Sequence, residues 1–190
     1  ELDRQTVGVY AKGATGILSG RAEGYYQMGT LGKADIGAWM VGVRAGVAPE
    51  VAGKPTFTLW YDRLSGDDDM SDTEIKAFST LYATDHKFYG MMDIAGFGVA
   101  SAADGRGLQD VALKVAAKPT KSTTLNLDAH QLMFSDDQGG DGTLGQELDL
   151  WAGAKINKHF ALGAGGSTFI WAADGLDNDM WGWLQMDANF

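Results

Sequence analysis

The sequence predicts an all-β fold, a transmembrane antiparallel up-and-down β-barrel. Three observations favour it: polar and apolar residues alternate with a period of two, the alternating segments are long, and short turns alternate with long loops. Barrel strands that cross a membrane need roughly 9–11 residues, whereas strands of soluble proteins have roughly 5–6. Glycine recurs inside the same segments and weakens the alternative of a helical fold.

Nine strands are expected, in one domain that covers residues 1–190. In Thr124–Ala129, leucine and alanine side chains share one face, while threonine, asparagine and aspartate share the other. This alternation is typical of a strand with one apolar and one polar face. The segments that show it are Thr6–Lys12, Gly16–Met28, Ile36–Ala48, Pro55–Arg63, Leu108–Ala117, Thr123–Met133, Leu144–Ile156, Phe160–Ile170 and Met180–Asn189.

The connections between these strands differ in length. Tight turns at 117–121 and 156–159 alternate with longer stretches rich in Asp and Gly at about 64–106, 134–143 and 171–179. Outer-membrane barrels combine short periplasmic turns with long extracellular loops, so we expect 64–106 to be a long extracellular loop. Bacterial single-chain barrels have even strand numbers, and Glu1 is preceded by no initiator methionine or signal peptide. We therefore expect the C-terminal portion of a larger barrel.

Aromatic residues on the apolar faces are expected to form two girdles, as they do at both membrane interfaces. The alternative is that aromatic residues are simply common in strands. The expected extracellular girdle is Tyr26, Trp39 and Tyr61, and the periplasmic girdle is Phe57, Phe160 and Phe190.

Composition excludes several classes of protein. The 190 residues carry a formal net charge of −10 and no cysteine. An acidic chain is a poor partner for nucleic acid, and without cysteine there is no disulfide scaffold or thiolate metal site. No apolar run reaches the roughly 20 residues of a transmembrane helix, but barrel strands are only half apolar.

Four stretches resemble the alginate-export family of outer-membrane proteins: Leu59–Asp68, Phe78–Asp93, Leu144–Leu150 and Ala22–Gly29. Their order and spacing fit the C-terminal half of that family. The resemblance implies a porin in the outer membrane of Gram-negative bacteria that exports an anionic polysaccharide such as alginate. Its implied partners are outer-membrane lipid, lipopolysaccharide, polysaccharide or a small solute, and other envelope proteins. The terminal Phe190 resembles the signal read by the barrel assembly machinery.

The polar phase of the strands predicts which charged residues line the lumen. They are Lys12, Arg21, Glu23, Arg44, Asp62, Lys114, Asp128, His130, Glu147, Asp149, Lys155 and Asp187. A path for a polyuronate should be lined by positive charge. This mixed lining instead favours a weakly selective pore or a different substrate.

Two pairs of these residues resemble catalytic or cation sites. Glu147 and Asp149 share one face and have the chemistry of an acid/base or cation site, although ion pairs with arginine or lysine across the lumen are favoured. Asp128 and His130 could belong to a hydrolase triad, but no serine is placed to complete it. We expect a pore-lining pair and no enzyme activity.

The long loop offers a candidate calcium site and a candidate helix. Asp67, Asp68 and Asp69 supply the oxygen ligands that Ca²⁺ prefers, without the spacing of an EF-hand, and a solvated acidic loop is the alternative; no other cofactor is expected. Residues 136–142 are similar and weaker. Ser71–Glu74 resembles a capping box. The apolar residues Phe78, Leu81, Tyr82, Phe88 and Tyr89 are expected to fold over the mouth or into the lumen.

Tryptophans on the inward phase could stack on sugar rings or fill space behind a loop. They are Trp60, Trp151, Trp171, Trp181 and Trp183. The predicted function is passive translocation of solutes through the outer membrane. One alternative is a non-conducting structural or adhesion protein whose loops contact glycans. A soluble β-sandwich lectin is another, which the long strands and the girdles disfavour.

Overall fold

A computed structural model describes residues 1–80, 88–94, 105–136 and 142–190. These ranges contain strands and no helix, hence no helix that could cross a membrane. The strands are β1 (Leu2–Thr15), β2 (Leu18–Leu31), β3 (Ala34–Val47), β4 (Thr56–Leu64), β5 (Glu74–Ile75), β6 (Leu108–Ala117), β7 (Thr123–Phe134), β8 (Thr143–Lys155), β9 (Phe160–Trp171) and β10 (Asp179–Ala188).

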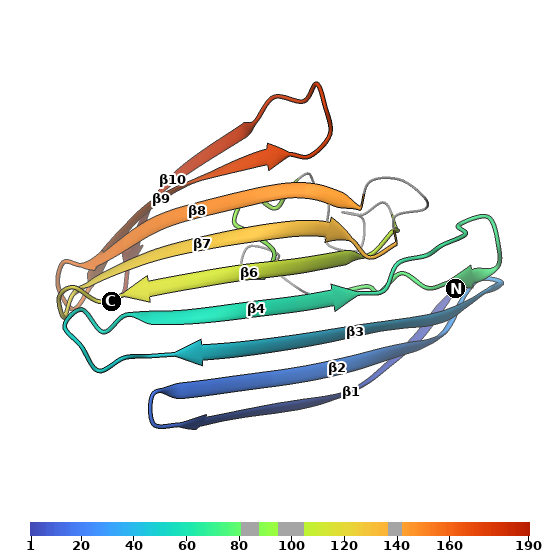
Figure 1. Cartoon of the computed structure of the whole chain (residues 1–190), viewed down its shortest axis with the longest axis horizontal. Coiled ribbons are helices and arrows are strands. Elements are labelled where there is room, and N and C mark those ends of the chain that lie inside the picture. Colours follow the sequence, from blue (N-terminus) through green and yellow to red (C-terminus); the bar gives the residue numbers. More distant parts are fainter. Residues whose placement is uncertain (81–87, 95–104, 137–141) are drawn as a thin grey trace.

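The strands form one 10-stranded sheet (Figure 1). Along the path β1-β2-β3-β4-β6-β7-β8-β9-β10, each strand pairs antiparallel with its neighbour, and the short β5 pairs parallel with β3. The sheet curls, but β1 and β10 do not pair with each other. The expected antiparallel all-β fold is confirmed, whereas this open sheet leaves barrel closure a prediction.

The nine expected strands correspond to the nine long strands, with shifted ends. The largest shift is in β1, which runs from Leu2 instead of Thr6. Its own sequence alternates poorly there, but it pairs with β2 from Leu2↔Leu31 to Thr15↔Leu18. Gly16 lies in the tight turn between them with a φ of 54°, not in a strand as expected. Pairing with the neighbouring strand therefore sets the ends of β1.

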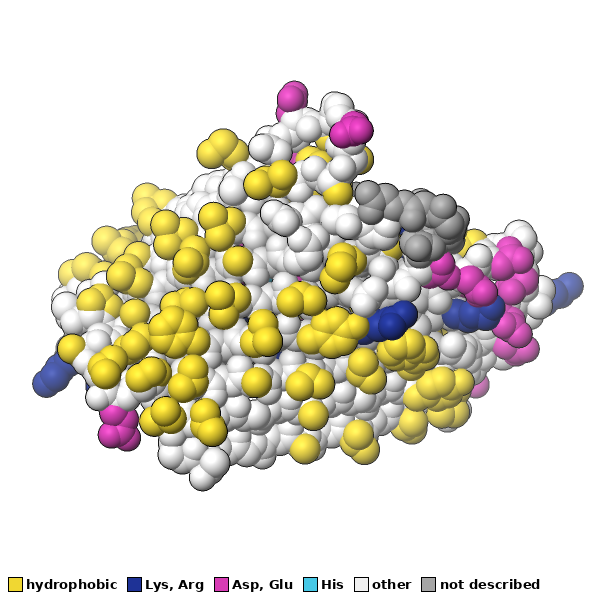
Figure 2. Space-filling view, viewed as in Figure 1, with side chains coloured by type: hydrophobic (Ala, Val, Ile, Leu, Met, Phe, Trp, Pro, Cys, Tyr) yellow, Lys and Arg dark blue, Asp and Glu magenta, His cyan; other side chains and the backbone are white. Residues whose placement is uncertain are grey.

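Hydrophobic side chains cover the outer, convex face of the sheet. In β3, Trp39, Val41 and Val43 are exposed, while the alternate residues Met40 and Arg44 are buried. Figure 2 shows hydrophobic side chains spread over the strands in view, with acidic side chains gathered at the loop end. The apolar residues at least 37% exposed on the outer phase include Val7, Val9, Val111, Leu113, Leu125, Leu127, Leu148, Leu150, Ile170, Leu184 and Met186. A soluble sheet would bury these side chains and expose the charged ones.

Aromatic residues lie toward both ends of the outer face. Tyr26 and Trp39 are cross-strand partners in the half of β2 and β3 nearer the long loops. Phe57 and Phe160 stand near the turn end, where the Phe160 and Phe190 rings meet edge to face with centroids 5.9 Å apart. These heights agree with the girdle positions predicted for Tyr26, Trp39, Phe57 and Phe160, whereas Tyr61 pairs with Val43 in the half of β3 nearer the short turns.

Parts of the connection between β4 and β6 that the structure describes, around Phe78 and in segment 88–94, fold into the concave face (Figure 1). Phe78 and Tyr89 are each 7% exposed and join a cluster with Met40, Leu108 and Phe169 of the sheet. Phe88 packs against this cluster. The inward folding predicted for Phe78, Phe88 and Tyr89 is confirmed, and Leu81 and Tyr82 lie outside the described residues.

The expected short helix after Ser71 is wrong, because Glu74 and Ile75 form β5. β4 pairs with β3 only from Met40 onward, which leaves the backbone groups at the start of β3 unpaired on that side. Asp35 and Ile36 bind β5 there. Pairing an exposed sheet edge is worth more than a marginal single helical turn.

Candidate functional site

The polar concave face carries the predicted lumen residues. Seven of them are buried: Glu23, Arg44, Asp62, Asp128, His130, Glu147 and Asp149. Arg21 and Lys114 are half-buried, while Lys12, Lys155 and Asp187 are exposed near the turn end. Lys114 pairs with Asp128, and His130 pairs with Glu147, across neighbouring strands. Paired residues project from the same face, so the polar face continues from one strand to the next. The alternation therefore predicted which face of the sheet these residues share.

An ion-pair network crosses β2, β3 and β4. Arg44 donates to both carboxylate oxygens of Asp62 at 2.6 and 2.7 Å, and its Nη1 lies 3.4 Å from Glu23. Arg21 donates to Glu23 at 2.7 Å. This bidentate geometry is among the stronger forms of a charged hydrogen bond. Gly42 provides room for it, because a Cβ there would lie 2.6 Å from Nη1 of Arg44.

A second network joins β6 and β7. Lys114 Nζ lies 2.7 Å from Asp128 and 3.2 Å from Nε2 of His130. The other ring nitrogen of His130 lies 2.9 Å from Asp110. Both nitrogens of the histidine are thus engaged by a lysine and a carboxylate. Within the described part of the chain, His130 contacts Lys114 and Asp110 and no serine, so the structure gives no support to the hydrolase arrangement considered for Asp128 and His130.

Trp60 links the two networks through its ring. The Arg44 guanidinium lies 4.2 Å from the ring centroid and Lys114 Nζ lies 4.7 Å from it. Phe88 of the loop packs nearby, with ring centroids 6.2 Å apart. Such cation–π contacts stabilise charges held away from water. The ring is engaged within the protein, and sugar stacking is not needed to explain it.

Glu147 and Asp149 bind the inserted loop. The Met92 N–H donates to Glu147 at 2.8 Å, and the Met91 N–H donates to Asp149 at 3.4 Å. Neither carboxylate forms an ion pair with any described residue, so the favoured expectation of salt bridges to arginine or lysine is wrong. Strand alternation predicted the face on which both residues lie. It could not predict their partners, because these are backbone N–H groups, which no sequence pattern identifies.

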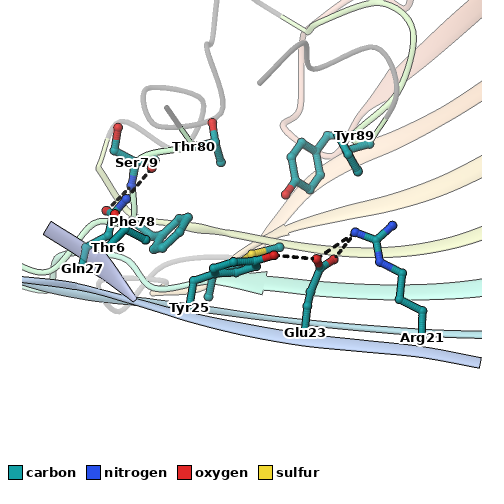
Figure 3. A pocket seen from close by; sticks show the side chains of 11 residues that line it. Thr6, Arg21, Glu23, Tyr25, Gln27, Phe78, Ser79, Thr80 and Tyr89 are labelled. Atoms are coloured by element: carbon teal, nitrogen blue, oxygen red, sulfur yellow. Dashed lines mark hydrogen bonds and ion pairs between the residues drawn. The ribbon is translucent and has the colours of Figure 1, made fainter. Parts of the chain in front are cut away.

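A second attachment of the loop was missed entirely. The Gln27 amide donates to the Ser79 carbonyl at 2.7 Å and accepts from the Ser79 N–H at 3.0 Å. In Figure 3, Ser79 and Phe78 lie over Gln27. They line a cavity of about 470 Å³ that Tyr25 also borders. Gln27 shares the inner phase of β2, so alternation placed its side chain, but an uncharged residue gave no reason to select it.

The three aspartates of the candidate calcium site point to different partners. Asp67 accepts from the backbone of Asp69 and Lys76, Asp68 binds Lys76 Nζ at 2.6 Å, and Asp69 binds Ser71. The Lys76 ammonium lowers the pKa of Asp68, and the Ser71 hydroxyl lowers that of Asp69. No set of three metal-ligating side chains converges within the described ranges. This geometry gives no support to a calcium ion.

The remaining tryptophans lie on the last three strands. Trp171 donates its indole N–H to Asp179 at 2.8 Å, and its ring meets Phe169 at 4.7 Å between centroids. Trp181 is 42% exposed. Trp151 and Trp183 are both cross-strand partners of Gly165. The structure thus separates the five tryptophans into Trp60 and Trp171, which are engaged within the protein, the exposed Trp181, and the pair Trp151 and Trp183 around a glycine.

Comparison with known proteins gives one family. The sequence model described as alginate export matches residues 1–174. No curated protein matches the chain.

Proposed function

Because the chain belongs to the alginate export family, we propose that its sheet forms part of the wall of an outer-membrane β-barrel. An anionic polysaccharide such as alginate would cross the membrane passively through the lumen. The protein would act as a porin in a Gram-negative envelope and catalyse no reaction.

The observation that carries this proposal is the inverted distribution of polarity. Leucine and valine side chains project outward from the strands, while arginine, aspartate and glutamate are buried on the concave face. Lipid favours an apolar outer band with aromatic girdles, and a pore favours a polar interior. A water-soluble protein would leave this apolar surface in contact with solvent, which is unfavourable.

The open edges of the sheet indicate what completes the wall. In lipid, an unpaired strand edge leaves backbone N–H and C=O groups without partners, at several kcal/mol each. β1 and β10 are such edges. Further strands that pair with both would close the barrel and remove this penalty.

The lining supports passage more than chemistry. Arg21, Arg44 and Lys114 are each paired with a carboxylate, so the middle of the face presents few free charges to a passing polymer. We infer a wall braced by ion pairs, with selectivity set by the inserted loop and by charges near the ends.

The test is single-channel conductance of the full-length native protein in planar bilayers. Conductance that oligouronates block and neutral oligosaccharides of equal length do not would support export of an anionic polysaccharide. Conductance blocked equally by both would leave a general porin. A protein that never conducts would overturn the proposed pore.

If the sheet lies in a membrane, a charge introduced on its outer face should destabilise the protein by an amount that depends on depth. Leu148, near the middle of β8, and Leu18, at the end of β2, are exposed to similar fractions, 48% and 55%. Leu148→Arg should destabilise the protein folded in lipid by roughly 2–4 kcal/mol, and Leu18→Arg by only about 0–1 kcal/mol, because the penalty depends on depth. Denaturant unfolding in vesicles measures both, and equal effects would argue against a membrane wall.

One observation favours a second candidate, a non-conducting barrel with an adhesive or structural role. Phe78, Tyr89 and the Met91–Met92 backbone fill part of the concave face and bind the wall. If this plug never leaves, solutes have no path. Conductance of variants that release the loop, argued in the Discussion, distinguishes a gated pore from a permanently closed barrel.

A further inference from the structure

A second cavity lies on the concave face at the turn end, away from the inserted loop. Its volume is about 360 Å³, within the roughly 300–1,000 Å³ typical of small-ligand sites. Strands β7 to β10 and the turn after β6 surround it. With the expected membrane orientation, this end faces the periplasm, where an exported polymer would first meet the barrel.

Two tryptophans and two glycines shape this cavity. Trp151 on β8 and Trp183 on β10 stand on either side of Gly165 on β9. A Cβ on Gly165 would lie 2.6 Å from the Cβ of Trp151 and 2.8 Å from Nε1 of Trp183. A Cβ on Gly163 would lie 3.1 Å from the Trp183 ring. The glycines therefore let the indole rings lie against bare backbone.

Several polar side-chain groups lie beside the two indole rings. The indole N–H of Trp183 is buried and has no acceptor among the described residues. Buried donors are normally paired, and an unpaired one calls for an explanation. Gln185, which donates to Asp187 at 2.8 Å, and Thr124 supply further hydrogen-bonding groups along the cavity wall.

Three lysines and one carboxylate, Asp187, line the rim of the cavity, so cationic groups outnumber anionic ones there. Lys118 and Lys121 come from the turn after β6, and Lys155 ends β8. Their ammonium groups form no ion pair with any described residue, whereas Arg44 and Lys114 farther along the face are both paired. Free cations beside aromatic rings have the chemistry to bind an anionic sugar, with the ring on the apolar sugar face and the lysines on its carboxylate.

We propose that this cavity is a binding subsite for one uronate residue of an anionic polysaccharide, at the turn-side mouth of the barrel. The inference rests on the proposed export function and deepens it by placing a first contact for the polymer. Trp151 and Trp183 would contact the sugar ring. Lys155 and Lys121 would bind its carboxylate, and Gln185 would form hydrogen bonds with its hydroxyl groups. The subsite is reached without displacing the inserted loop.

The test is calorimetric titration of the full-length protein in nanodiscs with a mannuronate tetrasaccharide and with maltotetraose. The native protein should bind the uronate more tightly than the neutral sugar. Lys155→Gln should weaken uronate binding by about tenfold, as expected for one charge-assisted hydrogen bond, and Trp183→Ala should weaken both sugars. Matched controls are Lys158→Gln, in the turn at the same end, and Met186→Ala, on the opposite face of β10; both should bind as the native protein does.

Channel conductance of the same variants separates the two proposals. A conducting protein whose uronate affinity is unchanged by Lys155→Gln and Trp183→Ala would overturn the subsite and leave the pore intact. Gly165→Ala gives a second route, because the added Cβ would clash with Trp151 Cβ and Trp183 Nε1 and shift the rings without removing a polar group. It should also abolish uronate binding, with quenching of tryptophan fluorescence by the sugar lost in parallel.

Discussion

Arg44→Ala is expected to destabilise the folded protein by about 3–5 kcal/mol, the typical effect of removing one partner of a buried ion pair. Arg44 is 5% exposed and Asp62 is 1% exposed, and two hydrogen bonds join them. Without the guanidinium, the Asp62 carboxylate would stay buried and uncompensated, and Glu23 would lose one of its two cations. Denaturant unfolding of the full-length protein in vesicles measures the loss.

The matched control is Lys12→Ala. Lys12 shares the concave face but is exposed and forms no ion pair with a described residue, so a change within about 0.5 kcal/mol is expected. The double variant Arg44→Met, Asp62→Leu should recover much of the stability, because both buried charges are removed together. If Arg44→Ala were as mild as Lys12→Ala, water in the lumen would be screening the pair and the network would not brace the wall.

Much of the sheet could be predicted from the sequence because a strand has a side-chain period of two. Once the phase of β3 is known from Trp39, Val41 and Val43, Arg44 must lie on the opposite face. Pairing in register then carries the same assignment from strand to strand. Local patterns therefore predicted which face each charged residue occupies, including residues such as Asp62 and Glu147 in different halves of the chain.

The partners of those residues could not be predicted, because they depend on contacts between distant segments. Glu147 binds the backbone of Met92, and Gln27 binds the backbone of Ser79. Every residue except proline has a backbone N–H, so the sequence does not indicate which of these groups a distant side chain binds. β5 was missed for the same reason, since its pairing with Asp35 depends on where β4 leaves the edge of β3 free.

Glu147→Leu is expected to raise the open-channel conductance, because Glu147 binds the inserted loop. Glu147 accepts the Met92 N–H at 2.8 Å, and leaving a buried donor without its acceptor costs about 1–3 kcal/mol. A loss of that size would increase the undocked population of segment 88–94 by about fivefold to a hundredfold. The substitution also removes one of two neighbouring carboxylates, so the wall itself should not be weakened by a new unpaired charge.

The same contact can be broken from the loop side by Gly90→Ala. Gly90 has a φ of 100°, and a Cβ there would lie 2.6 Å from Oε1 of Glu147. Gly175→Ala is the matched control, because Gly175 has a φ of 82° with no atom within 4 Å of the added Cβ. Both variants carry similar backbone strain, so only docking of the loop differs between them. Raised conductance in Glu147→Leu and Gly90→Ala but not in Gly175→Ala would identify segment 88–94 as a gate. If none of the three variants conducts while the barrel stays stable, the result would instead favour a permanently closed barrel and the structural or adhesive role.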